Sequence, residues 1–378
     1  MPRPTTKDPV ALFTDIDVDD QQRSPRHRWL GWSLVSGALI VVLAVAVIPS
    51  PYVVQKPGPV FDTLGTVDFG DEEVSLIDIE GAETFPTEGS LSMLTVSIQG
   101  NRDQPLTWFE VVRSWLTSSQ AVVPLDEVYP PGTTTEESSE QSRIEMESSQ
   151  QEAIAAALST LDYDFTSTLT VEGTDPEGAS ADVLLAGDII VSVNGETLRD
   201  VSALRAAVAT NGVDATASVE IIRDGSAAAV QIQPQLSDGE DPVPVFGVLV
   251  SSAFDFPIDV TIQLENVGGP SAGQMFALGI IDKLTPGALT GGAEIAGTGT
   301  IASSGEIGAI GGIRQKMYGA LWAGAEYFLA PETNCNEVTG FIPEGLSVFA
   351  VATLEDSLAA VDGIAAGKTD TLATCPVG

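Results

Sequence analysis

The sequence predicts a mixed α/β (α+β) protein with a β-rich module in its middle and one transmembrane helix near its N-terminus. Three observations predict this class. The run from Trp29 to Ser50 is apolar and uncharged. Residues 168–236 consist of short β-like runs and turn residues around one helical stretch. Residues 241–362 alternate β-like runs with helical runs, which is the pattern of an α/β domain.

The apolar run, WLGWSLVSGALIVVLAVAVIPS, holds 22 residues without a charged side chain. A helix of that length can cross a hydrocarbon core of about 30 Å. A cleaved signal peptide has a shorter apolar region near the start of the chain, whereas this run follows 28 residues and continues into PSPYVV. Arg23, Arg26 and Arg28 precede the run and only Lys56 follows it closely. We therefore expect a single-pass cell-membrane protein with its N-terminus in the cytoplasm and its main body outside.

The part of the chain expected outside the cytoplasm is strongly acidic. The first 28 residues contain five basic and five acidic residues, so the net charge of −37 lies entirely after them. Such a charge favours solubility and disfavours nucleic acid and anionic lipid surfaces as partners, because both would repel it.

Cys335 and Cys375 are the two cysteines of the chain, and both lie in this exported part. An oxidising environment favours their pairing, and a disulfide between them would hold the C-terminal tail. Two free buried thiols are the alternative, because nothing in the sequence fixes their distance.

The order of elements divides the exported part into segments. Before Val123 the runs VSLIDI and LSMLTVSI are typical of strands, and TWFEVVRSWL has the apolar spacing of a short helix. Residues 130–150 are polar and begin with chain breakers, which predicts a loop, and QQEAIAAALSTL after them predicts a helix. The predicted segments are a tail 1–28, a span 29–50, a β-rich segment 51–150, a β-rich module 151–240, an α/β domain 241–362 and a C-terminal tail 363–378.

The module over residues 151–240 resembles a PDZ domain of the bacterial protease-associated kind. It contains LLAGDIIVSVNG, then the helix-like VSALRAAVAT, then a hairpin at Arg223-Asp224-Gly225, where the Asp-Gly pair suits a tight turn. The resemblance implies capture of extended peptides, often C-termini, as an added strand. A plain spacer is the alternative, because the loop that would hold a terminal carboxylate is not identifiable.

Elimination narrows the chemistry that the exported part can perform. His27 is the only histidine and lies on the expected cytoplasmic side, which removes Ser-His-Asp and Cys-His arrangements. Two cysteines without histidine do not suit zinc, and no EF-hand loop is present. GIAAGKT falls one residue short of a phosphate-binding loop. We therefore expect no metal and no cofactor, with an oxygen-only calcium or magnesium site as the alternative.

A serine activated by lysine, or a carboxylate pair, is what remains. The exported part has four lysines, and there is no SxxK pairing. Lys56 lies next to the membrane and Lys368 lies in the tail. Lys283 follows Ser271 by 12 residues, which on one helix is a separation of about 18 Å. Lys316 is left, at the start of an amphipathic helix whose apolar neighbours could desolvate it.

VGGPSAG followed by TGTIASSGEIGAIGGIRQKMYGALWAGAEYFLAP resembles the proteolytic domain of Lon-type serine proteases, which use a Ser-Lys dyad. With the span, the YVVQKPGPVFDTLG stretch and the PDZ-like module, the chain is similar to bacterial membrane-anchored PDZ-containing Lon-like proteases. The resemblance implies Ser271 as nucleophile, Lys316 as general base and Thr298 as the residue that orients the lysine amine. It also implies that EGSLSMLTVSI opens the Lon fold, with the PDZ-like module inserted after it.

The sequence departs from the energy-dependent Lon pattern in three ways. Thr300 stands where an acidic residue is common, and the serine-to-lysine interval is two residues longer than usual. The AAA+ motor is absent, so we expect ATP-independent cleavage of peptides or of unfolded and misfolded proteins. Lon domains commonly assemble into rings, so the resemblance implies a homo-oligomer.

The glycines around the serine suggest why a hydroxyl is exposed there. Gly268, Gly269 and Gly273 would leave room for a substrate backbone, and Pro270 suits the first turn of a helix. We expect oxyanion stabilisation and substrate approach at Gly268, Gly269 and Ala272, beside the unpaired N–H groups of a helix N-terminus.

The prediction is therefore an anchored extracytoplasmic serine endopeptidase with a PDZ-like module that selects substrate or gates the cleft. The alternative from another class is a catalytically silent membrane scaffold that binds peptides or C-termini. A processor of the signal-peptidase kind shares the Ser-Lys chemistry but not these motifs.

Overall fold

The structure is a computed structural model that describes residue 29 and residues 31–39, 48–69, 72–237, 242–264 and 267–375. The predicted cytoplasmic tail and much of the predicted span, Trp29–Ser50, lie outside these residues, although residues 31–39 are helical and exposed. Among the residues described, no helix is long and apolar enough to cross a membrane.

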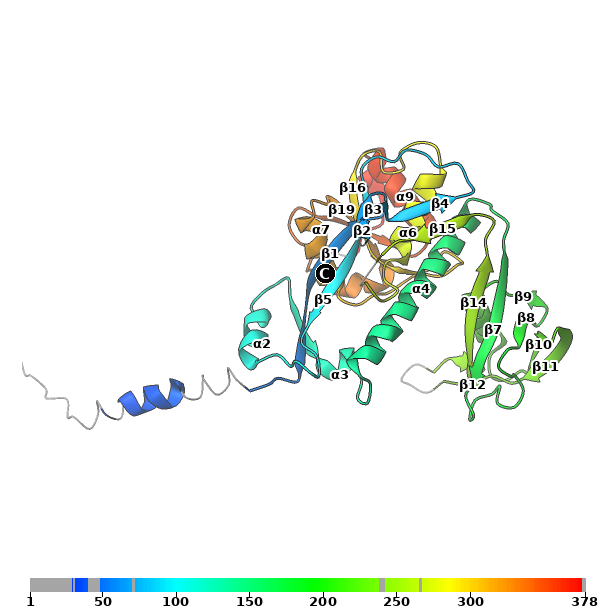
Figure 1. The fold of residues 1–378 in the computed structure, drawn as a ribbon, viewed down its shortest axis with the longest axis horizontal. Coiled ribbons are helices and arrows are strands. Elements are labelled where there is room, and N and C mark those ends of the chain that lie inside the picture. The colour runs from blue at the N-terminus through cyan, green and yellow to red at the C-terminus, as the bar shows by residue number, and fades with distance from the viewer. Residues whose placement is uncertain are drawn as a thin grey trace, which may run out of the picture.

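A six-stranded sheet joins the N-terminal and C-terminal parts of the described chain after residue 48, and the module between them lies apart on the other side of α4 (Figure 1). The strand order of this six-stranded sheet is β20 (Ser347–Val351), β19 (Tyr327–Pro331), β16 (Glu294–Gly297), β5 (Ser90–Gln99), β1 (Tyr52–Asp62) and β6 (Ala121–Pro124). The strands β20, β19, β16 and β5 run parallel, while β1 is antiparallel to both β5 and β6. The segment around EGSLSMLTVSI thus supplies the central strand β5.

Helices cover both faces of this sheet, as the alternation of side chains along the strands requires. Leu329 and Phe349 point into a core formed with α4 (Thr135–Thr160), α6 (Gly273–Leu284) and α9 (Leu354–Ala365). Their neighbours Phe328 and Val348 point into a second core formed with α7 (Ile313–Trp322). The helical runs predicted within residues 241–362, which are SAGQMFALGIIDKL, GIRQKMYGALWAGA and LEDSLAAV, are confirmed as α6, α7 and α9.

The predicted loop over residues 130–150 is wrong, because most of it belongs to α4, a single helix of 26 residues. A capping box between Thr134 and Glu137 starts the helix, and glutamate and glutamine are good helix formers. The C-terminal part of α4, around Ala153–Leu158, is buried against α6. The TxxE capping box was the available signal, but the polar composition concealed it.

The second large sheet belongs to the PDZ-like module. Its order is β11 (Ser226–Ile232), β10 (Ala217–Arg223), β8 (Ile189–Val193), β7 (Thr166–Thr174) and β14 (Val248–Asp255), with α5 (Val201–Asn211) beside it. Asp224 and Gly225 both have positive φ, which confirms the predicted hairpin. Because β14 pairs with β7, this sheet extends past residue 240, where the sequence placed the end of the module.

A buried carboxylate explains the LAGDII motif of this module. Asp188 accepts hydrogen bonds from Arg223 Nε at 2.7 Å, from Arg223 Nη2 at 2.6 Å and from Leu185 N at 2.8 Å. The side-chain hydrogen bond from Arg223 holds the pKa of Asp188 below its usual range. The motif therefore fixes the turn before β8.

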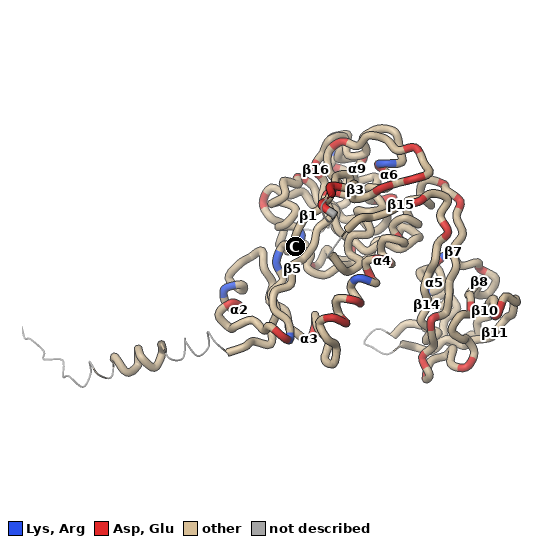
Figure 2. The backbone as a smooth tube through the Cα atoms, in the orientation of Figure 1, with Lys and Arg blue, Asp and Glu red and all other residues tan. Residues whose placement is uncertain are grey.

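Short elements complete the described chain. They are β2 (Thr66–Phe69), β3 (Glu72–Ser75), β4 (Ile77–Glu80), β9 (Glu196–Thr197), β12 (Gln235–Leu236), β13 (Pro244–Val245), β15 (Asp259–Ile262), β17 (Thr300–Ile301), β18 (Ile307–Gly308), α2 (Trp108–Trp115), α3 (Leu125–Val128), α8 (Cys335–Val338) and two 3₁₀ turns, η1 (Glu332–Asn334) and η2 (Thr369–Thr371). The predicted helix in TWFEVVRSWL is confirmed as α2. Acidic residues are spread along α4 and over the PDZ-like module (Figure 2).

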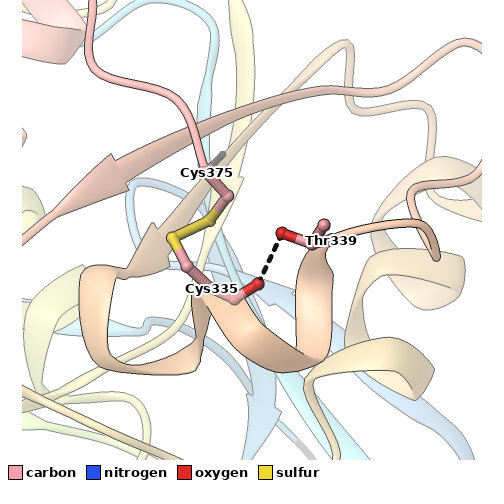
Figure 3. Close-up of a disulfide and its surroundings, with 3 residues drawn as sticks. All are labelled: Cys335, Thr339 and Cys375. Atoms are coloured by element: carbon pink, nitrogen blue, oxygen red, sulfur yellow. Dashed lines mark hydrogen bonds between the residues drawn. A yellow bond between two sulfur atoms is a disulfide. The ribbon is translucent and has the colours of Figure 1, made fainter. Parts of the chain in front are cut away.

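The two cysteines form a disulfide in the structure. Cys335 begins α8, and its bond to Cys375 ties the end of the described chain to that helix (Figure 3). Thr339 Oγ1 donates to the Cys335 carbonyl at 2.8 Å, which closes the short helix beside the disulfide.

Candidate active site

Ser271 lies in the turn immediately before α6, and α4 holds that turn in place. Gly269 N–H donates to the Ser142 carbonyl at 2.8 Å, and Ser149 Oγ donates to the Pro270 carbonyl at 2.9 Å. Gly269 has a φ of +84°, which a residue with a side chain rarely adopts. The serine segment is therefore anchored to the part of α4 that sequence reasoning had assigned to a loop.

Three side chains from three separate elements meet at this turn. Lys316, in the first turn of α7, places Nζ 2.7 Å from Ser271 Oγ and 2.8 Å from Thr298 Oγ1. Thr298, just after β16, donates its own hydroxyl to the Ser271 carbonyl at 2.8 Å. Gly299 N–H donates to the same carbonyl at 3.0 Å. Thr298 thus orients the lysine amine and fixes the backbone of the serine.

Burial controls the charge of this lysine. Lys316 is only 2% exposed, and no carboxylate of the described residues forms an ion pair with it. Desolvation lowers the pKa of Lys316 to about 7, so much of the amine is neutral near neutral pH. A neutral amine at hydrogen-bond distance from a serine hydroxyl can accept its proton.

The prediction that Gly268 and Gly273 leave room for a substrate backbone is wrong, because these glycines pack against other parts of the chain. A Cβ on Gly268 would come within 2.7 Å of Ser142 Cβ, and one on Gly273 within 2.7 Å of Ile301 Cγ2. The space beside both residues is therefore filled by this chain and is not left for a substrate backbone. Pro270 also lies before the helix, because Ala272 caps α6 and its first helical residue is Gly273.

The prediction that Gly268, Gly269 and Ala272 supply oxyanion donors also needs a correction. Gly269 cannot offer its N–H, because that group already donates to Ser142. The N–H groups of Gly268, Ser271 and Ala272 donate to no acceptor within the described chain. Those of Ser271 and Ala272 flank the N-terminus of α6, whose partial positive charge favours a developing negative charge.

A cleft of about 600 Å³ opens onto Ser271 and Lys316. One wall is the edge of β5 from Leu94 to Ile98, since β16 pairs with β5 only as far as Met93. Met146, Val267 and Ile310 contribute apolar side chains to the lining. Among the described residues of the lining, Lys316 alone is charged. The cleft thus offers a row of unpaired backbone groups of β5 beside apolar side chains.

The PDZ-like module has a comparable open edge. β14 pairs with β7 on one side, and the described residues provide no strand on its other side, near which α5 lies. Gly247, directly before β14, has a φ of +69° and its carbonyl accepts from Asp175 N and Ser180 Oγ. Sequence reasoning missed this edge because it assigned FGVLVSS to the following domain.

The module contacts the serine domain through Ser303, in the loop after β17. Ser303 N–H donates to Glu152 Oε2 of α4 at 2.6 Å, and its hydroxyl donates to Asp200. Asp200 is also the N-cap of α5, where it accepts from Ala203 N at 2.6 Å. Burial raises the pKa of Glu152.

No group of three or more histidine, cysteine or acidic side chains that could hold a metal exists in the described part of the chain.

Comparison with known proteins agrees with this architecture. Residues 264–361 match the model of the Lon protease (S16) C-terminal proteolytic domain, and residues 147–233 match that of the PDZ domain. The chain therefore combines a Lon-type proteolytic domain with a PDZ domain, and the Lon match supports a serine peptidase. Neither match is to an AAA+ module.

Individual relatives match over limited stretches. Lon protease of Helicobacter pylori strain J99 is 27% identical over 181 residues, which is 47% of this chain and 21% of the relative. Lon protease of Azospirillum brasilense is 33% identical over 93 residues, 24% of this chain and 11% of the relative. The matched stretches thus span about a fifth or less of the length of these relatives.

Among solved structures, the PDZ domain of an SdrC-like protein from Listeria monocytogenes is 20% identical and covers 22% of this chain and 85% of its own, with a TM-score of 0.21. The PDZ domain of an SdrC-like protein from Listeria innocua is 18% identical and covers 22% of this chain and 92% of its own, with a TM-score of 0.20.

Proposed function

We propose that this protein is a membrane-anchored, ATP-independent serine endopeptidase that uses Ser271 and Lys316 as a catalytic dyad. The observation that carries the proposal is the 2.7 Å contact between Ser271 Oγ and a buried lysine that forms no ion pair with any described carboxylate. A serine hydroxyl is a weak nucleophile until a base takes its proton, and this lysine has the pKa that such a base needs.

The reaction follows from the positions of the groups. The neutral Lys316 amine accepts the Ser271 proton as Oγ attacks the carbonyl carbon of the scissile peptide bond. The resulting oxyanion is stabilised by the free N–H groups of Ser271 and Ala272, a contribution of about 3 kcal/mol per donor in comparable sites. The Lys316 ammonium then protonates the leaving amine, and water releases the acyl group by the same steps.

The cleft supports an extended substrate. A peptide lying along β5 from Leu94 to Ile98 would pair with the open edge as an added strand and would present one carbonyl to Ser271. Only an unfolded or loose segment can adopt this conformation, so peptides and unfolded or misfolded proteins are the proposed substrates.

The PDZ domain supports selection of those substrates. The open edge of β14 beside α5 suits capture of a second extended segment. The contact of Asp200 with Ser303 links the start of α5 to the loop that follows Thr298 and Thr300. A segment bound beside α5 would in this way affect the geometry of the dyad.

The proposed location is the cell membrane, with the run Trp29–Ser50 as a single span, residues 1–28 in the cytoplasm and the catalytic body outside. The uncharged run and the basic residues before it support this orientation. The Cys335–Cys375 disulfide agrees with an oxidising compartment.

The test is cleavage of unfolded casein by the full chain in detergent, with and without ATP. The Ser271→Ala variant should lose turnover by roughly 10³-fold or more while still binding peptide. Ser75→Ala, which removes another half-buried hydroxyl that contacts a lysine, is the matched control and should retain activity. ATP should have no effect on the rate.

A silent peptide-binding scaffold is the second candidate, favoured by one observation. Thr300 stands in the cleft lining where energy-dependent Lon proteases commonly carry an acidic residue. If the parent chain binds peptides but cleaves none, with the Ser271→Ala variant indistinguishable from it, the scaffold is the correct function.

A further inference from the structure

The short helix α2 lies directly beside the end of the predicted span. Ser50 N–H donates to the Leu106 carbonyl at 2.7 Å, and Trp108 N–H donates to the Ile48 carbonyl at 3.4 Å. Pro49 also forms an isolated β-bridge with Thr107, the N-cap of α2. The last residues of the apolar run are thus fixed to the start of α2 by backbone contacts.

One side of α2 is packed against β1 and its neighbours. Val111 is fully buried, and Trp108 stacks edge-on against Tyr52 at 5.7 Å between ring centroids. Val54, in the middle of this small core, belongs to β1. The capping box between Thr107 and Glu110 fixes the start of the helix. α2 therefore has a defined orientation relative to the main sheet.

The other side of α2 is uncovered and exposes four large apolar side chains, with the charged Glu110 and Arg113 exposed beside them. Phe109, Val112 and Leu116 follow at positions i, i+3 and i+7, and Trp115 lies next to them; their exposed fractions are 63%, 46%, 85% and 67% respectively. Elsewhere in the described chain after residue 48, no stretch of eight residues exposes more than two large hydrophobic side chains. Such a cluster marks a contact surface.

We propose that this exposed face of α2 inserts into the headgroup region of the membrane that the predicted span crosses, so that α2 lies in the membrane plane. We choose a lipid surface as the partner of this α2 face because of where α2 lies. Backbone hydrogen bonds join its start to residues 48–50, where the predicted span would leave the bilayer. Tryptophan and phenylalanine favour that interface. The acidic exported body offers no charge attraction to anionic lipid, so apolar burial provides the contact.

Insertion of α2 would orient the cleft. Val54 of β1 pairs with Gln99 at the end of β5, next to Ile98, which lines the cleft. α2 packs on Val54 in one small core, so insertion of α2 into the membrane would hold the Ile98 end of the cleft close to the bilayer. A segment emerging from the membrane could then enter along β5.

The inference rests on the proposed anchoring, and the experiment separates the two. The full chain is placed in phosphatidylcholine vesicles with brominated acyl chains, in variants that keep one of the five tryptophans and replace the others by phenylalanine. Trp115 should be quenched at least twofold more than Trp322, which is also exposed, at 65%, but lies on α7. Trp32 reports the span itself.

Each outcome decides one proposal. If Trp32 is quenched but Trp115 is quenched no more than Trp322, the anchoring stands and the docking of α2 is wrong. If Trp32 is not quenched, the anchoring fails first. If Trp115 is shielded from both brominated lipid and aqueous acrylamide, another copy of the chain covers the face and the inference is overturned.

A second set of variants tests the apolar nature of the contact. Replacing Phe109 and Leu116 by serine should lower the quenching of Trp115 at least twofold and leave cleavage of a short soluble peptide within twofold. Raising the salt from 0.1 to 1 M should leave the quenching unchanged, because screening weakens charge contacts but not apolar burial. Loss of quenching at high salt would contradict the inference.

Discussion

The described part of the chain contains two serine-lysine pairs of similar geometry, and comparing them shows what a lysine needs to act as a base. Lys316 Nζ lies 2.7 Å from Ser271 Oγ, and Lys283 Nζ lies 2.9 Å from Ser75 Oγ. Burial lowers the pKa of both lysines. Contact distance alone therefore does not distinguish the two sites.

Their charged surroundings differ. Lys283 is half-buried, and the carboxylates of Asp62, Asp78 and Asp282 counteract part of the desolvation by raising its pKa. Lys316 is almost fully buried and burial is the only cause of its shift. The carboxylates beside Lys283 thus oppose the lowering of its pKa, whereas desolvation acts alone on Lys316 and lowers its pKa to about 7.

The two serines differ as well. Ser271 lies before the N-terminus of α6 with free N–H groups beside it and opens onto the larger cleft, of about 600 Å³. Ser75 ends β3, donates its hydroxyl to the Ile77 carbonyl at 2.8 Å and borders a cavity of about 270 Å³. Only the first serine combines a base, a place for an oxyanion and room for a peptide.

Replacing each lysine by methionine is the strongest test of this contrast. Lys316→Met should lower kcat/KM by roughly 10³-fold or more, because the base is lost, while Lys283→Met should stay within about threefold. Thermal unfolding is measured beside cleavage. The Lys316→Met protein should be as stable as the parent or about 1 kcal/mol more stable, since it no longer buries an amine. Equal losses in both variants would remove the distinction.

Thr298 is a feature that the Ser75 site lacks. Thr298→Val should lower kcat by roughly 10- to 100-fold, because the lysine amine and the Ser271 carbonyl each lose a hydrogen bond. Thr298→Ser keeps the hydroxyl and should recover most of the rate. KM for a short peptide should change little in either variant. A serine variant as slow as the valine variant would show that packing, and not the hydroxyl, is what matters.

The pH dependence of kcat/KM tests whether the absence of a described carboxylate beside Lys316 keeps the pKa of this lysine low. With the Lys316 pKa at about 7, kcat/KM should be level above pH 8 and fall about tenfold per pH unit below pH 6, because the ammonium cannot accept a proton. Thr300→Glu adds a carboxylate to the cleft lining and should move the midpoint upward by about one unit, toward the behaviour of Lys283. An unchanged midpoint in that variant would show that the two sites differ for another reason.

The lowered pKa of Lys316 also makes the free energy of unfolding depend on pH in a known direction. The folded pKa of Lys316 lies below its value near 10.4 in an unfolded chain, so the unfolded state binds more protons between these values. The contribution of Lys316 to stability therefore rises as the pH rises from about 7 to 10. Lys316→Met should flatten the stability profile in this window, as measured by urea unfolding.

The disulfide should have the smallest effect on cleavage. Cys335 and Cys375 belong to the core that packs on α7, the helix of Lys316, and not to the core around α6 and Lys283. Replacing both by serine should cost about 2 to 4 kcal/mol of unfolding free energy. Activity at 25 °C should fall less than threefold. A larger loss of activity at full folding would show that the disulfide positions Lys316 itself.

The sequence by itself indicated the dyad candidates and much of the local structure. Exclusion of histidine and the spacing of the lysines led to Lys316, and the two motifs led to Ser271 and Thr298, because these signals lie within short stretches. The Asp224-Gly225 turn and the helices α2, α5, α6, α7 and α9 are likewise local properties. The predicted domain boundaries, the span and its orientation stay predictions.

Tertiary structure alone decided what surrounds the serine. Ser149 and Pro270 are 121 residues apart, and Ser75 and Lys283 are 208 residues apart, so no local pattern could pair them. The role of α4, the filled space beside Gly268 and the apolar face left open on α2 depend on how distant elements pack. The pKa of Lys316 belongs to this class too: the sequence shows a lysine, but only packing excludes both water and carboxylates from it.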